Sequence, residues 1–183
     1  MKRPELIPFA IGFILLTYLM SWLPPKTAPY PAVYLLLSLS VFRRKALLYS
    51  SGAILSSSFL SWILLDSYIP LIGMAAAFLM LPVRREMQSL KLWERGLNAL
   101  FALMVAYVSL VSPEVGIRVF GVLAALLLLS GERGTASMGL LMGSAVFMAI
   151  PLANLSDMNP VIFLAFSAVL LVYSLHHLQK LLR

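Results

Sequence analysis

The sequence predicts an all-α polytopic transmembrane helical bundle, and three observations lead to that class. Of the 183 residues, 61% are hydrophobic and only 11% are charged, whereas soluble domains average about 45–50% apolar and about 25% charged residues. The mean hydropathy of the chain is +0.95. The apolar residues also fall into runs that charged residues or prolines separate. We therefore expect lipid to be the main solvent of this chain.

Eight apolar runs are predicted to form about eight short spans, since a bilayer core needs about 17–25 helical residues and fewer where the membrane is thin. Lys2 and Arg3 precede the first run as in a signal peptide, but no small-x-small cleavage site follows it, so the run is kept as a span. The second run is the shortest and is retained because of the charge pattern described next. The eight runs are Leu6–Leu23, Pro31–Phe42, Ala46–Leu65, Tyr68–Val83, Leu97–Ser112, Val115–Ser130, Thr135–Leu155 and Val161–Leu175.

The distribution of lysine and arginine predicts that both chain ends lie in the cytoplasm. With eight spans, only Lys26 and Arg118 of the fourteen basic residues fall on the outer side. Removing the second span would move the basic run at 43–45 outside, against the tendency of basic residues to stay inside. The predicted inner residues are Lys2, Arg3, Arg43, Arg44, Lys45, Arg84, Arg85, Lys91, Arg95, Arg133, Lys180 and Arg183.

Residues 1–183 are predicted to form one integral membrane domain that contains two halves, 1–83 and 96–183. The segment 84–95 mixes apolar and charged residues, so we expect it to lie on the inner membrane surface between the halves. The turn at Asp66–Pro70 resembles the turn at Asp157–Pro160. The likeness predicts a 4+4 internal repeat with parallel halves.

Several kinds of chemistry are excluded by composition and placement. The chain has no cysteine, which rules out disulfides and thiolate metal sites. None of the charged residues falls in the middle of a predicted span, so no buried carboxylate for ion coupling is expected. His176 and His177 are adjacent near the inner end, and their side chains point about 100° apart on a helix. The two histidines are predicted to be interfacial, and no catalytic residue, metal site or cofactor is assigned. The net charge of +7 is attributed to basic residues that are retained on the cytoplasmic side, and not to nucleic-acid binding.

Small residues on the third and seventh runs allow two interpretations. Ala53, Ser57 and Ser61 share one helix face, and Gly139 and Gly143 form a Gly-x-x-x-Gly match. Such residues let helices pack closely, which is the first interpretation. The second is a polar lining for a solute. The candidates for that path are Ser57, Ser61, Tyr107, Ser109, Ser144 and Asn154.

Three charged residues are candidates for contacts at the outer mouth. Arg118 is the deepest charge, about one turn inside the outer boundary, and Asp66 and Asp157 lie in outer turns. Two aspartates could share a proton as in an aspartyl protease, but no Gly-x-Gly-Asp pattern surrounds either of them. Turn or helix-end capping is the preferred interpretation of both.

The sequence favours a multi-pass cell-membrane protein that is permease- or channel-like, carrying a small neutral or weakly polar molecule without ion coupling. Two alternatives stay open: a non-catalytic accessory or sensory subunit of a larger membrane complex, and an intramembrane enzyme. The expected partners are the lipid bilayer and either a second copy of the chain or another membrane protein. A permease predicts a polar cavity along the third and seventh runs, a subunit predicts a solid core, and an enzyme predicts titratable groups gathered in a cleft.

Overall fold

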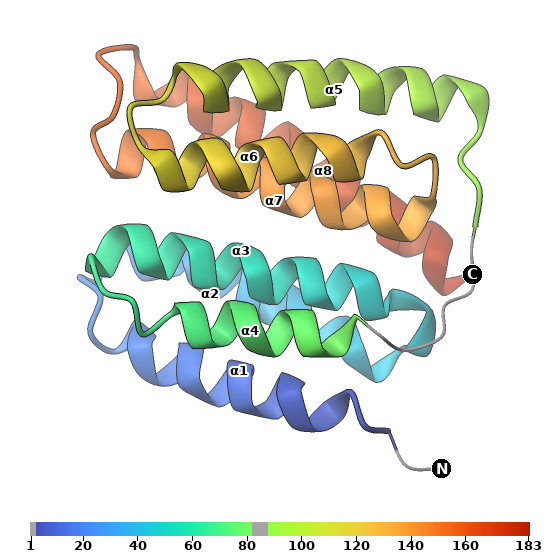
Figure 1. The fold of residues 1–183 in the computed structure, drawn as a ribbon, viewed down its shortest axis with the longest axis horizontal. Helices are drawn as coiled ribbons and strands as arrows, with labels where there is room; N and C mark the ends of the chain where they lie inside the picture. The colour runs from blue at the N-terminus through green and yellow to red at the C-terminus, as the bar shows by residue number, and fades with distance from the viewer. Residues whose placement is uncertain (1–2, 82–87) are drawn as a thin grey trace. The chain divides into compact units, whose positions relative to one another are not determined.

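The computed structural model describes residues 3–81 and 88–183, apart from the side chain of Arg44, and these residues form helices joined by turns, with an isolated antiparallel β-bridge between Ser89 and Glu132 (Figure 1). Within the described ranges there are eight α-helices and two short 3-10 helices. The α-helices are α1 (Leu6–Met20), α2 (Pro29–Ser38), α3 (Leu47–Leu65), α4 (Leu71–Met80), α5 (Leu92–Val111), α6 (Val115–Leu128), α7 (Arg133–Leu152) and α8 (Pro160–Leu182); η1 (Leu39–Phe42) and η2 (Arg44–Ala46) join α2 to α3.

The all-α class is confirmed, and each of the eight predicted apolar runs overlaps one α-helix. Four helices, α3, α5, α7 and α8, are long and apolar enough to cross a membrane, with 19 to 23 residues each. The remaining four apolar helices are shorter, at 10–17 residues. Eight crossings and the cytoplasmic placement of both ends stay predictions.

Three helices extend beyond their predicted runs at charged residues, and α2 begins at Pro29, two residues before its predicted run. Helix α5 begins at Leu92 and not at Leu97, α7 begins at Arg133, and α8 continues past Leu175 to Leu182. The sequence analysis ended each run where charges appear, but a helix end accommodates charged side chains that cap it or pair with another helix. The predicted surface segment 84–95 is therefore only partly a connection: 84–87 lie outside the described residues, and 92–95 are the first turn of α5.

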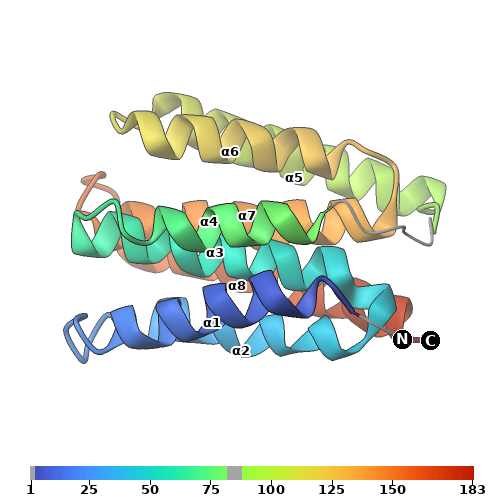
Figure 2. The ribbon, with the colours of Figure 1, turned by 60° about the horizontal axis from the view of Figure 1, so that its bottom comes forward.

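The first compact unit, Met1–Glu86, is built around α3. Helix α2 packs on one side of α3 and α4 on another, and α4 also packs against α1 (Figure 2). Serine hydroxyls on α3 donate to carbonyl groups of both neighbours: Ser57 to Pro31 at 3.0 Å, and Ser51 to Ala77 at 2.9 Å. These bonds fix α3 against α2 and α4 without any charged group.

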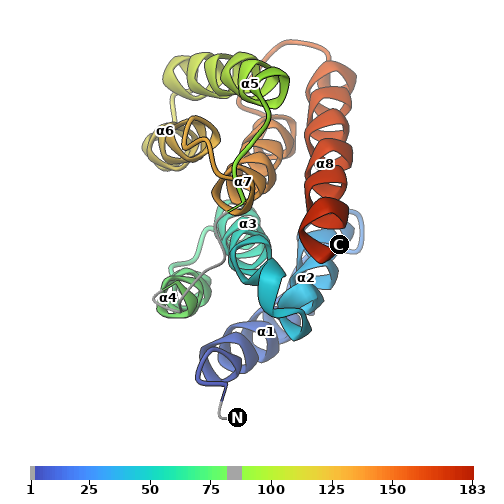
Figure 3. The same ribbon diagram turned by 90° about the vertical axis from the view of Figure 1, so that its right-hand side faces the viewer.

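The second compact unit, Met87–Arg183, places α7 between α6 and α8, with α5 beside α6 (Figure 3). Glycines of α7 set its distances to α6 and α5. A Cβ atom at Gly139 would lie 2.8 Å from the carbonyl oxygen of Ala124, and one at Gly143 would lie 2.8 Å from a methyl carbon of Val105. In both α3 and α7, 83% of the most apolar stretch is buried. The prediction that these two helices are buried and closely packed is confirmed.

The two units share the count of four helices but differ in how the helices pack. In the first unit the fourth helix, α4, packs along both the first and the third helix, whereas in the second unit the fourth helix, α8, packs mainly along the third, α7. The 4+4 repeat and the predicted halves 1–83 and 96–183 stay predictions.

Candidate functional site

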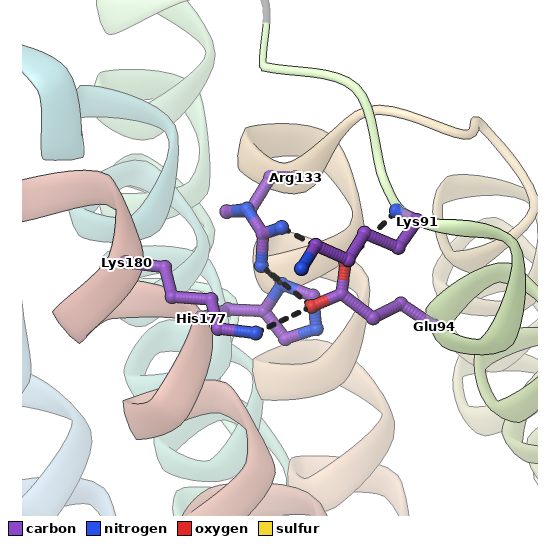
Figure 4. A network of polar contacts seen from close by, with 5 residues as sticks. All are labelled: Lys91, Glu94, Arg133, His177 and Lys180. Carbon is purple, nitrogen blue, oxygen red and sulfur yellow. Dashed lines mark hydrogen bonds and ion pairs between the residues drawn. The ribbon is translucent and has the colours of Figure 1, made fainter.

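A buried carboxylate, Glu94, is the centre of a polar cluster in the second unit (Figure 4). Glu94 is the third residue of α5, and its Oε2 accepts a hydrogen bond of 2.9 Å from the backbone amide of Lys91, the N-cap residue. This bond uses one of the amide groups that a helix start leaves without a partner. The capping bond holds the carboxylate at the helix start, where it faces α7 and α8.

Two cations from other helices bind the same carboxylate. Arg133, at the start of α7, donates to Oε1 at 3.0 Å and to Oε2 at 2.8 Å. Lys180, near the end of α8, places Nζ 2.8 Å from Oε1. The Glu94 side chain is 0% exposed, that of Arg133 7% and that of Lys180 30%. The two-pronged arginine contact is the strongest form of such a pair.

A short turn positions Arg133. Gly131 takes a positive φ of 75°, a conformation that glycine adopts without strain. The carbonyl of Gly131 accepts from the amide of Leu90 at 3.0 Å, and the amide of Arg133 donates to the carbonyl of Gln88 at 2.8 Å. The segment just before α5 is thus bonded to the turn just before α7, which brings Glu94 and Arg133 together.

His177 completes the cluster on α8. Its Nδ1 lies 3.5 Å from Nη1 of Arg133, and its ring meets the Tyr173 ring edge-on with centroids 4.7 Å apart. A guanidinium only donates, so this contact assigns the acceptor role to Nδ1 and the N–H to Nε2. His177 is buried and His176 is half-buried. The interfacial position of the two histidines stays a prediction.

Buried polar atoms of three side chains in this unit have no hydrogen-bond partner among the described residues. They are both amide atoms of Asn98, the hydroxyl of Tyr173 and Nε2 of His177. Asn98 follows Glu94 by one helical turn, and Phe101, one turn further, contacts the Tyr173 ring at 5.6 Å. Since Glu94 and Phe101 both contact α8, Asn98 lies between two α5–α8 contacts.

A groove of about 640 Å³ runs along α5 and α8, and of the three side chains only Tyr173 is among the residues that line it. Its walls include Leu97, Phe101, Val169 and Val172, with Tyr173 and His176 at one end. A second groove, of about 340 Å³, lies further along α5 and α8, and residues of α7 and of the turn before α8 also line it. The surface between α5 and α8 is thus hollowed and mostly apolar.

Among the path candidates, three hydroxyls are engaged with backbone carbonyls. Ser57 bonds to Pro31, Ser109 to Val105 at 2.6 Å, and Ser144 to Leu141 at 2.7 Å. The Ser61 hydroxyl is buried and has no partner within the described residues. A lining role for these four serines stays a prediction.

The other predicted residues are exposed. Tyr107 is 70% exposed in the second groove, and Asn154 lies in the turn after α7 with a φ of 53°. Arg118 donates from Nε to the carbonyl of Ser112 at 2.7 Å. Asp66 ends α3 with a φ of 47°, and Asp157 lies in the turn before α8. Path lining by Tyr107 and Asn154 and the outer-mouth role of the three charged residues also stay predictions.

The sequence analysis missed the cluster of Glu94, Arg133, His177 and Lys180. One signal was present: Glu94 and Asn98 are four residues apart, so two polar side chains share a face of an otherwise apolar helix. Within the described chain, no group of three or more histidine, aspartate or glutamate side chains is arranged to hold a metal ion.

No family model, curated protein or solved structure matches this chain. The fold alone defines its class: an all-helical protein with four helices of membrane-spanning length and apolar composition. These helices are compatible with a membrane protein, and the function is argued from the polar site in the second unit.

Proposed function

We propose that the chain is a permease- or channel-like protein of the cell membrane that binds and passes a small neutral or weakly polar molecule without ion coupling. The observation that supports the proposal is the set of unpartnered buried atoms on Asn98, Tyr173 and His177. A buried polar group without a partner costs about 1–3 kcal/mol. A small molecule with both donors and acceptors would recover that free energy by binding there.

The charges nearby favour a neutral molecule over an ion. Glu94 accepts four hydrogen bonds, from Arg133 twice, from Lys180 and from the amide of Lys91. A cation would have to displace two bonded cations to reach this carboxylate. The unpartnered groups are an amide, a hydroxyl and an imidazole N–H, which bind a neutral solute but do not neutralise a bare charge at low cost.

The test measures solute flux into proteoliposomes with glycerol and urea as probes. Wild-type vesicles are expected to equilibrate faster than protein-free vesicles, and Asn98→Leu is expected to lose most of that difference. Ser137→Ala is the matched control, since its buried hydroxyl bonds within α7 to the carbonyl of Gly134 at 2.7 Å, and its flux should equal that of the wild type. Equal flux with and without protein for both probes, or a strict need for a pH or sodium gradient, would contradict the proposal.

A second candidate, an accessory or sensory subunit, is favoured by the serine bonds of α3. Ser50, Ser51 and Ser57 all donate to carbonyls outside their own helix. Such bonds use hydroxyls to join helices, as expected of a solid core. This candidate predicts no flux of either probe and a stable complex with another membrane protein after purification in mild detergent.

A further inference from the structure

The two grooves along α5 and α8 are lined mostly by apolar side chains, as a site for an acyl chain would be. Successive turns supply apolar walls, first Leu97 and Val172, then Met104 and Phe163 in the second groove. Helix α5 has 20 residues and is therefore about 30 Å long, close to the thickness of a bilayer hydrocarbon core. A lipid chain lying in these grooves would cover apolar walls along much of that length.

One end of the groove carries groups that suit a lipid headgroup. Lys180 follows the groove residue His176 by one turn of α8, and its Nζ lies 5.5 Å from the centre of the Trp93 ring. Trp93 precedes the groove residue Leu97 by one turn of α5 and is 55% exposed. Tryptophan and lysine favour the depth of lipid headgroups. This is also the end that the basic-residue distribution assigns to the cytoplasm.

The charge balance at this end is positive. The single charge of Glu94 is already matched by Arg133, and both side chains are buried. Lys180 therefore adds an uncompensated charge, and one bond to Glu94 leaves two of its three N–H groups for other acceptors. A phosphate group is the anion that a headgroup would place at this depth.

We propose that this groove is a binding site for an anionic phospholipid, with an acyl chain between α5 and α8 and the phosphate at Lys180 beside Trp93. The proposal goes beyond the solute site, because it uses the apolar groove and Lys180; of the three solute-site side chains, Tyr173 alone lines the groove. A free phosphate ion would leave the apolar walls uncovered, so the two parts of the site together favour a lipid.

The experiment uses Trp93 as the only tryptophan, in a background of Trp22→Phe and Trp62→Phe. The protein is reconstituted in phosphatidylcholine containing increasing fractions of phosphatidylglycerol, with brominated chains on one lipid or the other. Bromine quenches tryptophan fluorescence on contact, so the two series give the relative association constant of the lipids near Trp93. One lysine near a membrane surface contributes about 1 kcal/mol, so phosphatidylglycerol should bind about fivefold more tightly.

Two pairs of variants distinguish binding at this site from a general electrostatic attraction of anionic lipid to the protein. Lys180→Gln should reduce the preference to near one, while Lys91→Gln, a charge-matched change outside the groove, should keep it. Ala168 also lines the groove, so Ala168→Phe should fill it and lower quenching by phosphatidylglycerol, while Val119→Phe on the exposed side of α6 should not. The proposal would be overturned if the two lipids quenched Trp93 equally, or if both lysine variants lost the preference for phosphatidylglycerol to the same extent. An unchanged preference in Ala168→Phe would also overturn it.

Discussion

Replacing Arg133 by methionine tests whether the buried ion pair holds the second unit together. The change removes two hydrogen bonds, of 3.0 and 2.8 Å, from a carboxylate that is 0% exposed. Losing one partner of a buried pair typically costs about 3–5 kcal/mol, because a charge is left without compensation. Lys180 and the Lys91 amide would still bind Glu94, so we expect a loss near 3 kcal/mol, at the lower end of that range.

The double variant Glu94→Met/Arg133→Met distinguishes the net contribution of the ion pair to stability from the cost of leaving one of its charges without a partner. Replacing both partners of a buried pair by apolar residues is often neutral or stabilising, so the double variant should be more stable than Arg133→Met alone. The assay is equilibrium unfolding in mixed detergent micelles, followed by circular dichroism. Arg95→Met, an exposed arginine of the same helix, is the control and should change stability by no more than about 0.5 kcal/mol. A loss below about 1 kcal/mol in Arg133→Met, or no recovery in the double variant, would refute the reasoning.

Two further predictions concern packing and topology. Gly139→Ala should cost about 1–3 kcal/mol of unfolding free energy in the same assay, because the new Cβ would meet backbone atoms of α6 at 2.8 and 2.9 Å. The control is Gly96→Ala, whose new Cβ would have nothing within 4 Å and should stabilise α5 by about 0.5–1 kcal/mol. Equal effects of the two substitutions on stability would contradict the packing account. Since the chain has no cysteine, single cysteines at Ala28 and Ser89 can be labelled with a membrane-impermeant reagent, and labelling of both from one side would end the eight-span topology.

The helices were predictable because apolar runs carry their signal locally. Each predicted run overlaps a helix, and the small residues of α3 and α7 correctly indicated buried, closely packed elements. The boundaries failed where the sequence is charged. Glu94 and Lys180 were taken to lie outside their spans because isolated charges are costly in lipid, and nothing local shows that a partner removes that cost.

The polar cluster was not predictable because its members are far apart in sequence. Arg133 lies 39 residues and Lys180 86 residues from Glu94, and only the packing of α5, α7 and α8 brings them together. The sequence around Arg133 and Lys180 favours an interpretation of both as basic residues near the inner membrane surface. The same position is predicted for most lysines and arginines of this chain. The unpartnered state of Asn98 likewise depends on what surrounds it in the fold.

The central claim is that Asn98 binds a small neutral molecule inside the second unit, and solid-state NMR in bilayers tests it most directly. Magnetisation transfer is measured from isotope-labelled urea to the side-chain nitrogen of asparagine, in the wild type and in Asn98→Leu. The account predicts a transfer signal in the wild type that is absent from the variant. A wild-type protein without that signal, or a signal that persists in Asn98→Leu, would contradict the proposed site.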